Sequence, residues 1–379
     1  MASDRSVRSQ VTGVALIVAT VLPGFLTAAL APRIRGDFDF GDSTLGVTIA
    51  IFYVVSALSS TPCGRLVDRI GGVSGMRLAA ALVVACATTV ALFAQSAAGL
   101  VGLLVLGGVA NGMGGPAVSA LLKREVSEQS QGLAFGVQQS GAPIGSLLAG
   151  LALPLVAIPF GWRWGFVAAA VLAVVAVIPV PRGGPLLPAA ATVARRGLSS
   201  VHAIAVAAAL ASAAGVGFIS FLVTYAVRSD IGESEAGLLL GAVSLVATLS
   251  RVGLGALFDR SGREPLALVG ATLVAAAGAY LLLIEGEPAT IVAGALVAGG
   301  LGWSWPGGLT LAVVRRSPES PAWAVGVMMS GLFAGAVAGP LVVGLLAEHG
   351  SFAAVWSLCA GLALLAGLLL LGTRRAEAR

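Results

Sequence analysis

Two short stretches of the sequence place charged residues and glycines at the same spacing. They read "GRLVDRIGG" and "GALFDRSGR", and the second follows the first by about 190 residues. In each stretch an aspartate at a helix end can bind the N-terminus of a neighbouring helix or an arginine. The glycines allow close helix packing and a tight turn. The residues that we single out as a gating motif are Gly64, Asp68, Arg69, Gly71, Gly255, Asp259, Arg260 and Gly262.

One basic residue, Arg251, lies inside an apolar segment, roughly 12 Å from the helix end marked by Asp259. An arginine at that depth costs about 2.5 to 3.5 kcal/mol on insertion scales, so it should face a cavity or a partner. Its planar and permanent charge suits a small anion. The alternatives are that the side chain extends to the membrane surface or pairs with the nearby motif. The corresponding position before the first stretch is Ser60.

Further polar and aromatic residues fall inside apolar segments and are candidates for contact with a substrate. Amides that faced lipid would be costly to bury, so they should point inward. Hydrogen bonds between helices are the alternative role for the amides, and packing is the alternative for the tryptophans. Together with Arg251, the predicted substrate-binding residues are Tyr53, Asn111, Gln138, Gln139, Tyr225, Trp303 and Trp305.

The elements that carry these residues follow from composition. Of 379 residues 58% are hydrophobic and only 10% are charged, and the mean hydropathy is +0.99. Apolar runs long enough to cross a bilayer recur along the chain, so we predict a multi-pass helical membrane protein. The sequence shows no nucleotide-binding loop, no metal-ligand spacing and no nucleophile paired with a base. We therefore expect no enzyme activity, no cofactor and no metal.

Charges, prolines and turn residues divide the apolar sequence into twelve predicted spans. The spans lie near 11–31, 43–63, 76–95, 98–121, 132–158, 163–180, 201–226, 236–257, 265–284, 289–313, 322–346 and 352–372. A segment rich in proline, glycine and arginine separates the first six spans from the last six. The predicted domains are a six-helix bundle at 1–181, a linker at 182–200 and a second six-helix bundle at 201–379.

Orientation follows from the arginines and the single lysine, which collect in alternate loops. Basic loops resist translocation, so we expect both termini and the linker in the cytoplasm, and the chain in the cell membrane. This bias explains the net charge of +5. We expect lipid and a small-molecule substrate as partners, no nucleic acid, and a monomer.

The repeat extends beyond the opening motif. "FGVQQSG" from Phe135 is matched by "VGVMMSG" from Val325, and basic pairs at Lys123 and Arg315 lie before them. Two halves of six spans each are parallel and related by a pseudo-twofold axis along the membrane normal, which predicts a site between the halves near the bilayer midplane.

The two opening stretches resemble the signature loop of the major facilitator superfamily, G-x-L-x-D-R-x-G-R/K. The resemblance covers essentially the whole chain, although the first copy has Gly72 and Val73 where the family usually has basic residues. It implies an all-α fold of twelve transmembrane helices, alternating access, and a role as cytoplasmic latches for Asp68 and Asp259. A topological anchor of solvated charges is the alternative for both aspartates.

More loosely, the chain resembles the cyanate, nitroimidazole and monocarboxylate carriers, and Arg251 looks like the eighth-helix arginine that monocarboxylate carriers use for a substrate carboxylate. The helix 4 motif of the family's antiporters, R-x-x-Q-G, reads "GVANG" here, without the arginine. We expect a secondary transporter for a small organic solute, with an anion as one option. The alternatives are efflux of apolar drugs or natural products and, in another class, a membrane sensor or receptor that does not transport.

Overall fold

The computed structural model describes residues 2–38, 42–178, 198–349 and 351–377, and these residues form helices and short connections without a strand. The prediction of an all-α fold is confirmed. The predicted linker at 182–200 lies outside the described residues except for its last three positions. The chain divides into two compact units whose residues mainly contact one another. Each unit contains a short segment from the other half of the sequence.

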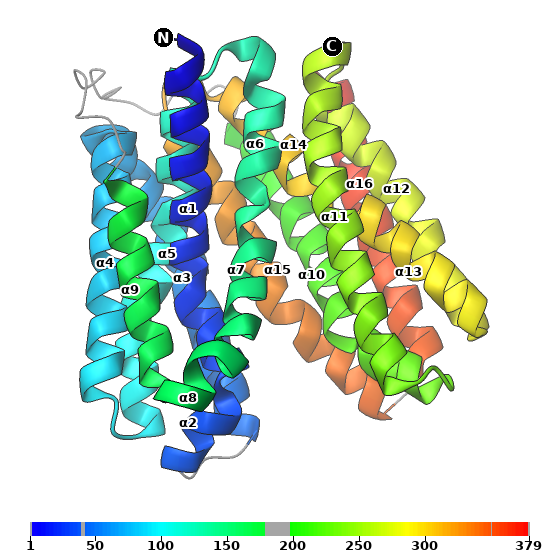
Figure 1. Cartoon of the computed structure of the whole chain (residues 1–379). Helices are drawn as coiled ribbons and strands as arrows, with labels where there is room; N and C mark the ends of the chain where they lie inside the picture. The colour runs from blue at the N-terminus through cyan, green and yellow to red at the C-terminus, as the bar shows by residue number, and fades with distance from the viewer. Residues whose placement is uncertain (1, 39–41, 179–197, 350, 378–379) are drawn as a thin grey trace. The chain divides into compact units, whose positions relative to one another are not determined.

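The first unit comprises residues 1–128, 137–193 and 317–330. Its helices are α1 (Ala2–Ala29), α2 (Ala31–Asp37), α3 (Asp42–Ile70), α4 (Gly72–Phe93), α5 (Ala97–Glu125), α7 (Gly141–Ala152), a π-helical turn (Leu153–Ala157), α8 (Ile158–Phe160) and α9 (Arg163–Val177). Helix α5 packs against α1, α3 and α4, and α9 packs against α1 and α4 (Figure 1). A core that includes Leu26, Leu30 and Phe166 joins these helices.

The second unit comprises residues 129–136, 194–316 and 331–379. Its helices are α6 (Gln131–Gln139, as far as Gly136), α10 (Leu198–Arg228), α11 (Glu233–Ser261), α12 (Pro265–Leu282), α13 (Pro288–Gly302), α14 (Trp305–Arg316), α15 (Pro321–His349, from Gly331) and α16 (Phe352–Glu377), with short 3-10 turns at Glu128–Ser130 and Leu283–Glu285. Helix α12 packs against α13 and α16, and α10 packs against α16 (Figure 1).

Each of the twelve predicted spans coincides with helix over most of the residues that the structure describes. Nine of the described helices are long and apolar enough to cross a bilayer without interruption. The fifth predicted span is divided at Ser140 into α6 and α7, and the tenth is divided at Trp303 and Ser304 into α13 and α14. The sixth corresponds to the shorter helix α9. The fifth and tenth spans are therefore divided well inside their length, and the first is divided near its end, at Leu30 between α1 and α2.

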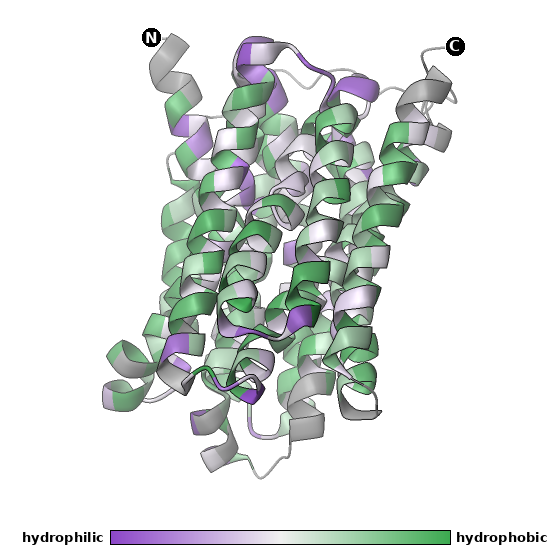
Figure 2. Cartoon of the chain, turned by 90° about the vertical axis from the view of Figure 1, so that its right-hand side faces the viewer, coloured by the Kyte–Doolittle hydropathy of each residue, from purple (hydrophilic) through white to green (hydrophobic). Residues whose placement is uncertain are grey.

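Hydrophobic residues make up most of the length of the helices, and hydrophilic residues gather mainly near helix ends and connections (Figure 2). Leu58, Leu238 and Ile178 are more than 70% exposed. Such exposure of large apolar side chains is costly in water and favourable in hydrocarbon. The exposed surface thus fits lipid.

The glycines of α15 set its distance from α10. A side chain at Gly331, Gly335 or Gly339 would overlap the backbone of Ala205, Ala209 or Ala213, respectively. Small residues four apart let two helix backbones approach closely. In α7, Gly141 and Gly145 likewise lie against Ile17 and Val21 of α1.

Candidate functional site

Asp68 lies near the C-terminal end of α3 and binds the N-terminus of α15. Its carboxylate oxygens accept hydrogen bonds from the backbone N–H groups of Ala322 at 3.0 Å and Trp323 at 2.8 Å. The first N–H groups of a helix have no partner within the helix, and the helix dipole favours a negative charge beside them. Asp68 therefore supplies both the acceptors and the charge that this helix end requires.

Asp259 makes the equivalent arrangement near the end of α11. It accepts hydrogen bonds from the N–H groups of Gly132 at 2.7 Å and Leu133 at 2.8 Å, in the first turn of α6. The two motif copies thus bind helix N-termini in the same way. Each aspartate lies in one half of the sequence and holds a helix that begins in the other half.

The motif glycines explain why the helices come so close at these points. A side chain at Gly64 would overlap the carbonyl of Ala322, and one at Gly255 would lie 2.5 Å from the carbonyl of Gly132. Gly71 has a φ of 84° and Gly262 a φ of 60°, which are left-handed values that favour glycine. Arg69 and Arg260 are exposed.

Sequence reasoning did not identify the partners of the two aspartates. The partner segments begin one turn before the repeated "FGVQQSG" and "VGVMMSG" stretches, so the repeat contained a signal. Gly136 and Gly326, the glycines of those stretches, lie against the carbonyls of Arg251 and Ser60. The first glycine of each stretch therefore marks a helix crossing.

The basic pairs of the repeat have different partners in the two halves. Lys123 donates a hydrogen bond to the carbonyl of Pro318, just before α15.

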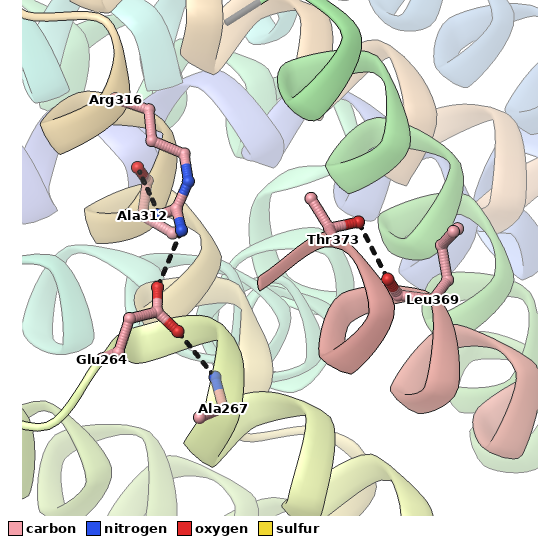
Figure 3. A network of polar contacts seen from close by, with 6 residues as sticks. All are labelled: Glu264, Ala267, Ala312, Arg316, Leu369 and Thr373. Atoms are coloured by element: carbon pink, nitrogen blue, oxygen red, sulfur yellow. Dashed lines mark hydrogen bonds and ion pairs between the residues drawn. The ribbon is translucent and has the colours of Figure 1, made fainter. Parts of the chain in front are cut away.

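Arg316 binds Glu264 at 2.8 Å and the carbonyl of Ala312 at 3.3 Å (Figure 3). Glu264 also accepts a hydrogen bond from the N–H of Ala267 and thereby caps α12. Figure 3 also shows the hydroxyl of Thr373 donating to the carbonyl of Leu369 within α16. The Glu264 and Arg316 pair connects α12 to α14.

Arg251 is buried, with 7% of its surface exposed, and contacts the division between α13 and α14. Its Nε donates to the carbonyl oxygen of Trp303 at 2.8 Å, and its guanidinium carbon lies 5.1 Å from the centroid of the Trp303 ring. Among the buried residues that the structure describes, Arg251 is the one with a charged side chain.

The predicted amide contacts lie in the first unit. Asn111 of α5 donates to the hydroxyl of Ser56 of α3 at 3.0 Å. Gln138 exchanges hydrogen bonds with the Ser119 hydroxyl at 3.2 and 3.3 Å, and its amide also donates to the Gly115 carbonyl at 3.4 Å. Both side chains make hydrogen bonds between helices, which was the alternative to substrate contact, and their contact with substrate stays a prediction.

The other candidates have varied surroundings. Tyr53 and Gln139 are half-buried, and Tyr53 packs edge-on against Phe52. The Tyr225 hydroxyl donates to the carbonyl of Leu283, and its ring lies 5.0 Å from that of Trp356. Trp305 is buried, and its Nε1 has no hydrogen-bond partner among the described residues. Tyr225 therefore forms part of the aromatic core of the second unit.

A polar cluster between α2, the end of α4 and the start of α9 was not predicted. Arg163 donates from Nη1 to the Asp37 carboxylate at 2.7 Å and from Nη2 to the carbonyl of Ala94 at 2.9 Å. Its guanidinium carbon lies 4.4 Å from the centroid of the Trp162 ring. Trp162 also donates from Nε1 to Asp37 at 2.9 Å. The Trp162 hydrogen bond, with Arg163 as the second cause, lowers the pKa of Asp37 below its ordinary value. The cluster connects α2, the end of α4 and the start of α9.

No group of three or more metal-binding side chains occurs in the part of the chain that the structure describes. The three cysteines are buried and free.

Comparison with known proteins agrees with this architecture. The family model described as Major Facilitator Superfamily matches residues 12–225 and 203–379. An uncharacterized MFS-type transporter of Mycobacterium tuberculosis is 27% identical over 311 residues, which cover 78% of this chain and 69% of that protein.

Solved structures share the fold at low sequence identity. The human organic anion transporter MFSD10 superimposes with a TM-score of 0.73 at 19% identity, over 97% of this chain and 99% of that one. The proton:xylose symporter XylE superimposes with a TM-score of 0.80 at 14% identity, over 98% and 96%. Together with the family match, these comparisons show that the chain belongs to the Major Facilitator Superfamily and is a membrane transporter, not an enzyme.

Proposed function

We propose that the chain is a secondary transporter that moves a small organic anion across the cell membrane by alternating access. The observation that carries the proposal is the pair of motif carboxylates, each bound to the N-terminus of a helix from the other half of the sequence. A transporter of this kind needs contacts between its halves that form in one state and break in the other.

The two motif carboxylates suit a contact that forms and breaks, which we call a latch, because each makes strong hydrogen bonds but only two of them. Asp68 and Asp259 each accept two backbone N–H groups and engage a helix dipole. Hydrogen bonds to a charged group contribute about 1.5 to 3 kcal/mol. Separation of α3 from α15, or of α11 from α6, would return the carboxylate and the N–H groups to water, which compensates part of the loss. The latch therefore favours one state without making it permanent.

Arg251 favours an anion as the transported solute. Its guanidinium is buried in the second unit beside the Trp303 carbonyl, and a permanent positive charge at this depth attracts an anion. The planar guanidinium can bind a carboxylate through two parallel hydrogen bonds. MFSD10 is an organic anion transporter of the same fold, so the architecture is compatible with this class of solute.

Uptake into proteoliposomes tests the proposal. The purified chain would be assayed with radiolabelled lactate, oxalate and cyanate, and with a cationic dye as the probe for drug efflux. Arg251→Gln should abolish anion uptake, whereas Arg263→Gln, which removes an exposed charge after α11, should leave it unchanged. Anion uptake that is equal in the wild type and in Arg251→Gln would contradict the role of the arginine. Transport of the dye alone would favour efflux, and absence of all transport would favour a sensor.

The same assay distinguishes the coupling modes. Uptake that needs no ion gradient indicates uniport, and uptake that needs solute on the opposite side indicates exchange. Uptake that rises as the outer pH falls indicates that the solute enters with a proton.

A further inference from the structure

The tenth predicted span is interrupted by a helix break, which we define as Trp303 and Ser304. Helix α13 ends at Gly302 and α14 begins at Trp305, and Trp303 has φ −119° and ψ 2°. Pro306 has no N–H, so it cannot donate to the carbonyl of Gly302 as the residue four positions later in a helix would. A break within an apolar span leaves backbone carbonyls that need donors from elsewhere.

Arg251 supplies one of these donors from the neighbouring helix α11. Its Nε binds the carbonyl oxygen of Trp303 at 2.8 Å, and its guanidinium lies over the indole ring of the same residue. The arginine thus contacts both the backbone and the side chain at the break. Without this donor the Trp303 carbonyl would lack a partner within its own helix, and an unsatisfied buried carbonyl is unfavourable.

Glycines enclose the break on its other sides. A side chain at Gly215 of α10 would overlap the indole nitrogen of Trp303, so the ring is seated directly on that helix. A side chain at Gly307 would lie 3.0 Å from the Cα of Gly136, and one at Gly136 would lie 2.6 Å from the carbonyl of Arg251. The backbones of α6, α11 and α14 therefore meet beside the arginine.

The first half of the chain has neither the break nor the arginine. Helix α5 continues without interruption through Asn111, the residue that the repeat aligns with Trp303. Asn111 binds the hydroxyl of Ser56, and the position that matches Arg251 is Ser60, whose hydroxyl donates to its own helix. The break and the buried arginine thus occur together in one half, and both are missing at the matching positions of the other.

We propose that Arg251 is a positioning residue that keeps the backbone of the helix break in its observed conformation. In a second step, an anionic solute binds the guanidinium and withdraws it from the Trp303 carbonyl, so that the backbone at the break becomes mobile. A carboxylate is a stronger acceptor for guanidinium than a neutral carbonyl and can bind it in two places. When the carboxylate binds through Nε and one Nη, the solute competes with the Trp303 carbonyl for the Nε donor. This second step rests on the proposed function, whereas the first does not.

Hydrogen exchange of the full chain in lipid nanodiscs, without solute, tests the first step. Arg251→Gln should raise the exchange rate of the amides in residues 303–309 by about ten- to a hundredfold, because the break loses a charged hydrogen bond. Arg251→Lys should not restore protection, since an ammonium cannot both bind the carbonyl and stack as a plane on the ring. Arg263→Gln is the matched control and should leave these amides unchanged.

Gly215→Ala provides an independent variant that keeps the arginine. It displaces the Trp303 ring and should raise exchange in the same segment, so the first step can be tested even if Arg251→Gln fails to fold. The assignment of Arg251 would be overturned if the amides of residues 303–309 exchanged at the wild-type rate in Arg251→Gln. It would also be overturned if they did so in both Arg251→Lys and Gly215→Ala.

Oxalate tests the second step, with uncharged glycerol as the control. Oxalate should raise exchange at 303–309 in the wild type and have no effect in Arg251→Lys, a difference that a purely structural arginine would not produce. Oxalate uptake without any change at the break would overturn the competition. If the variants loosen the break but no anion is transported, the proposed function fails and the role of Arg251 at the break stands.

Discussion

Replacement of Asp68 by asparagine should weaken the contact between α3 and the N-terminus of α15. The carboxylate accepts the N–H groups of Ala322 and Trp323, and asparagine has one carbonyl oxygen and no charge. Two charged hydrogen bonds of about 1.5 to 3 kcal/mol each would be exchanged for one neutral bond of about 1 kcal/mol. Because Asp68 is half-buried and partly screened by solvent, we expect a net loss of about 2 kcal/mol, which corresponds to about a 30-fold change in population.

Hydrogen exchange measures this change directly. The amides of Ala322 and Trp323 should exchange about 30-fold faster in Asp68→Asn, since opening of the contact exposes them to solvent. Arg65→Gln is the control, because Arg65 is an exposed residue on the same helix. Asp259→Asn should produce a similar change at Gly132 and Leu133. Unchanged exchange at α15 in Asp68→Asn, with the protein folded, would refute the reasoning.

Three further perturbations have expected outcomes. Gly335→Leu should prevent close packing of α15 on α10 and lower the thermal unfolding temperature, whereas Gly361→Leu, in open space, should not. Asn111→Val should lower the unfolding temperature by an amount that corresponds to about 1 kcal/mol, the worth of its bond to Ser56. Because the pKa of Asp37 is lowered in the folded state, its stabilising effect is complete above about pH 4 and is lost as the pH falls through the folded value. The unfolding free energy of Asp37→Asn should therefore be lower than that of the wild type above about pH 4, and the two should converge as the pH falls below it. A difference that stays constant over the whole pH range would contradict this.

The sequence was sufficient for the fold class because its signals are local. A long apolar run predicts a membrane helix wherever it occurs, and the repeat of Asp68 and Asp259 shows the two halves without any structure. The breaks at Ser140 and Trp303 were not predicted, since a proline or glycine inside a membrane helix is tolerated when neighbours supply donors. The donor for the Trp303 carbonyl is Arg251, which lies on another helix about fifty residues earlier in the sequence, so the break could not be predicted from its own segment.

For the candidate site, the sequence showed which residue types were available. It identified the two aspartates, the glycines that accompany them and the single arginine inside an apolar span. What those side chains contact followed from the fold: the helix N-termini at Ala322 and Gly132, and the Trp303 carbonyl. The physical reason is that a backbone N–H or carbonyl is the same in every residue. The sequence therefore carries no direct mark of which backbone groups are left without a partner inside their own helix.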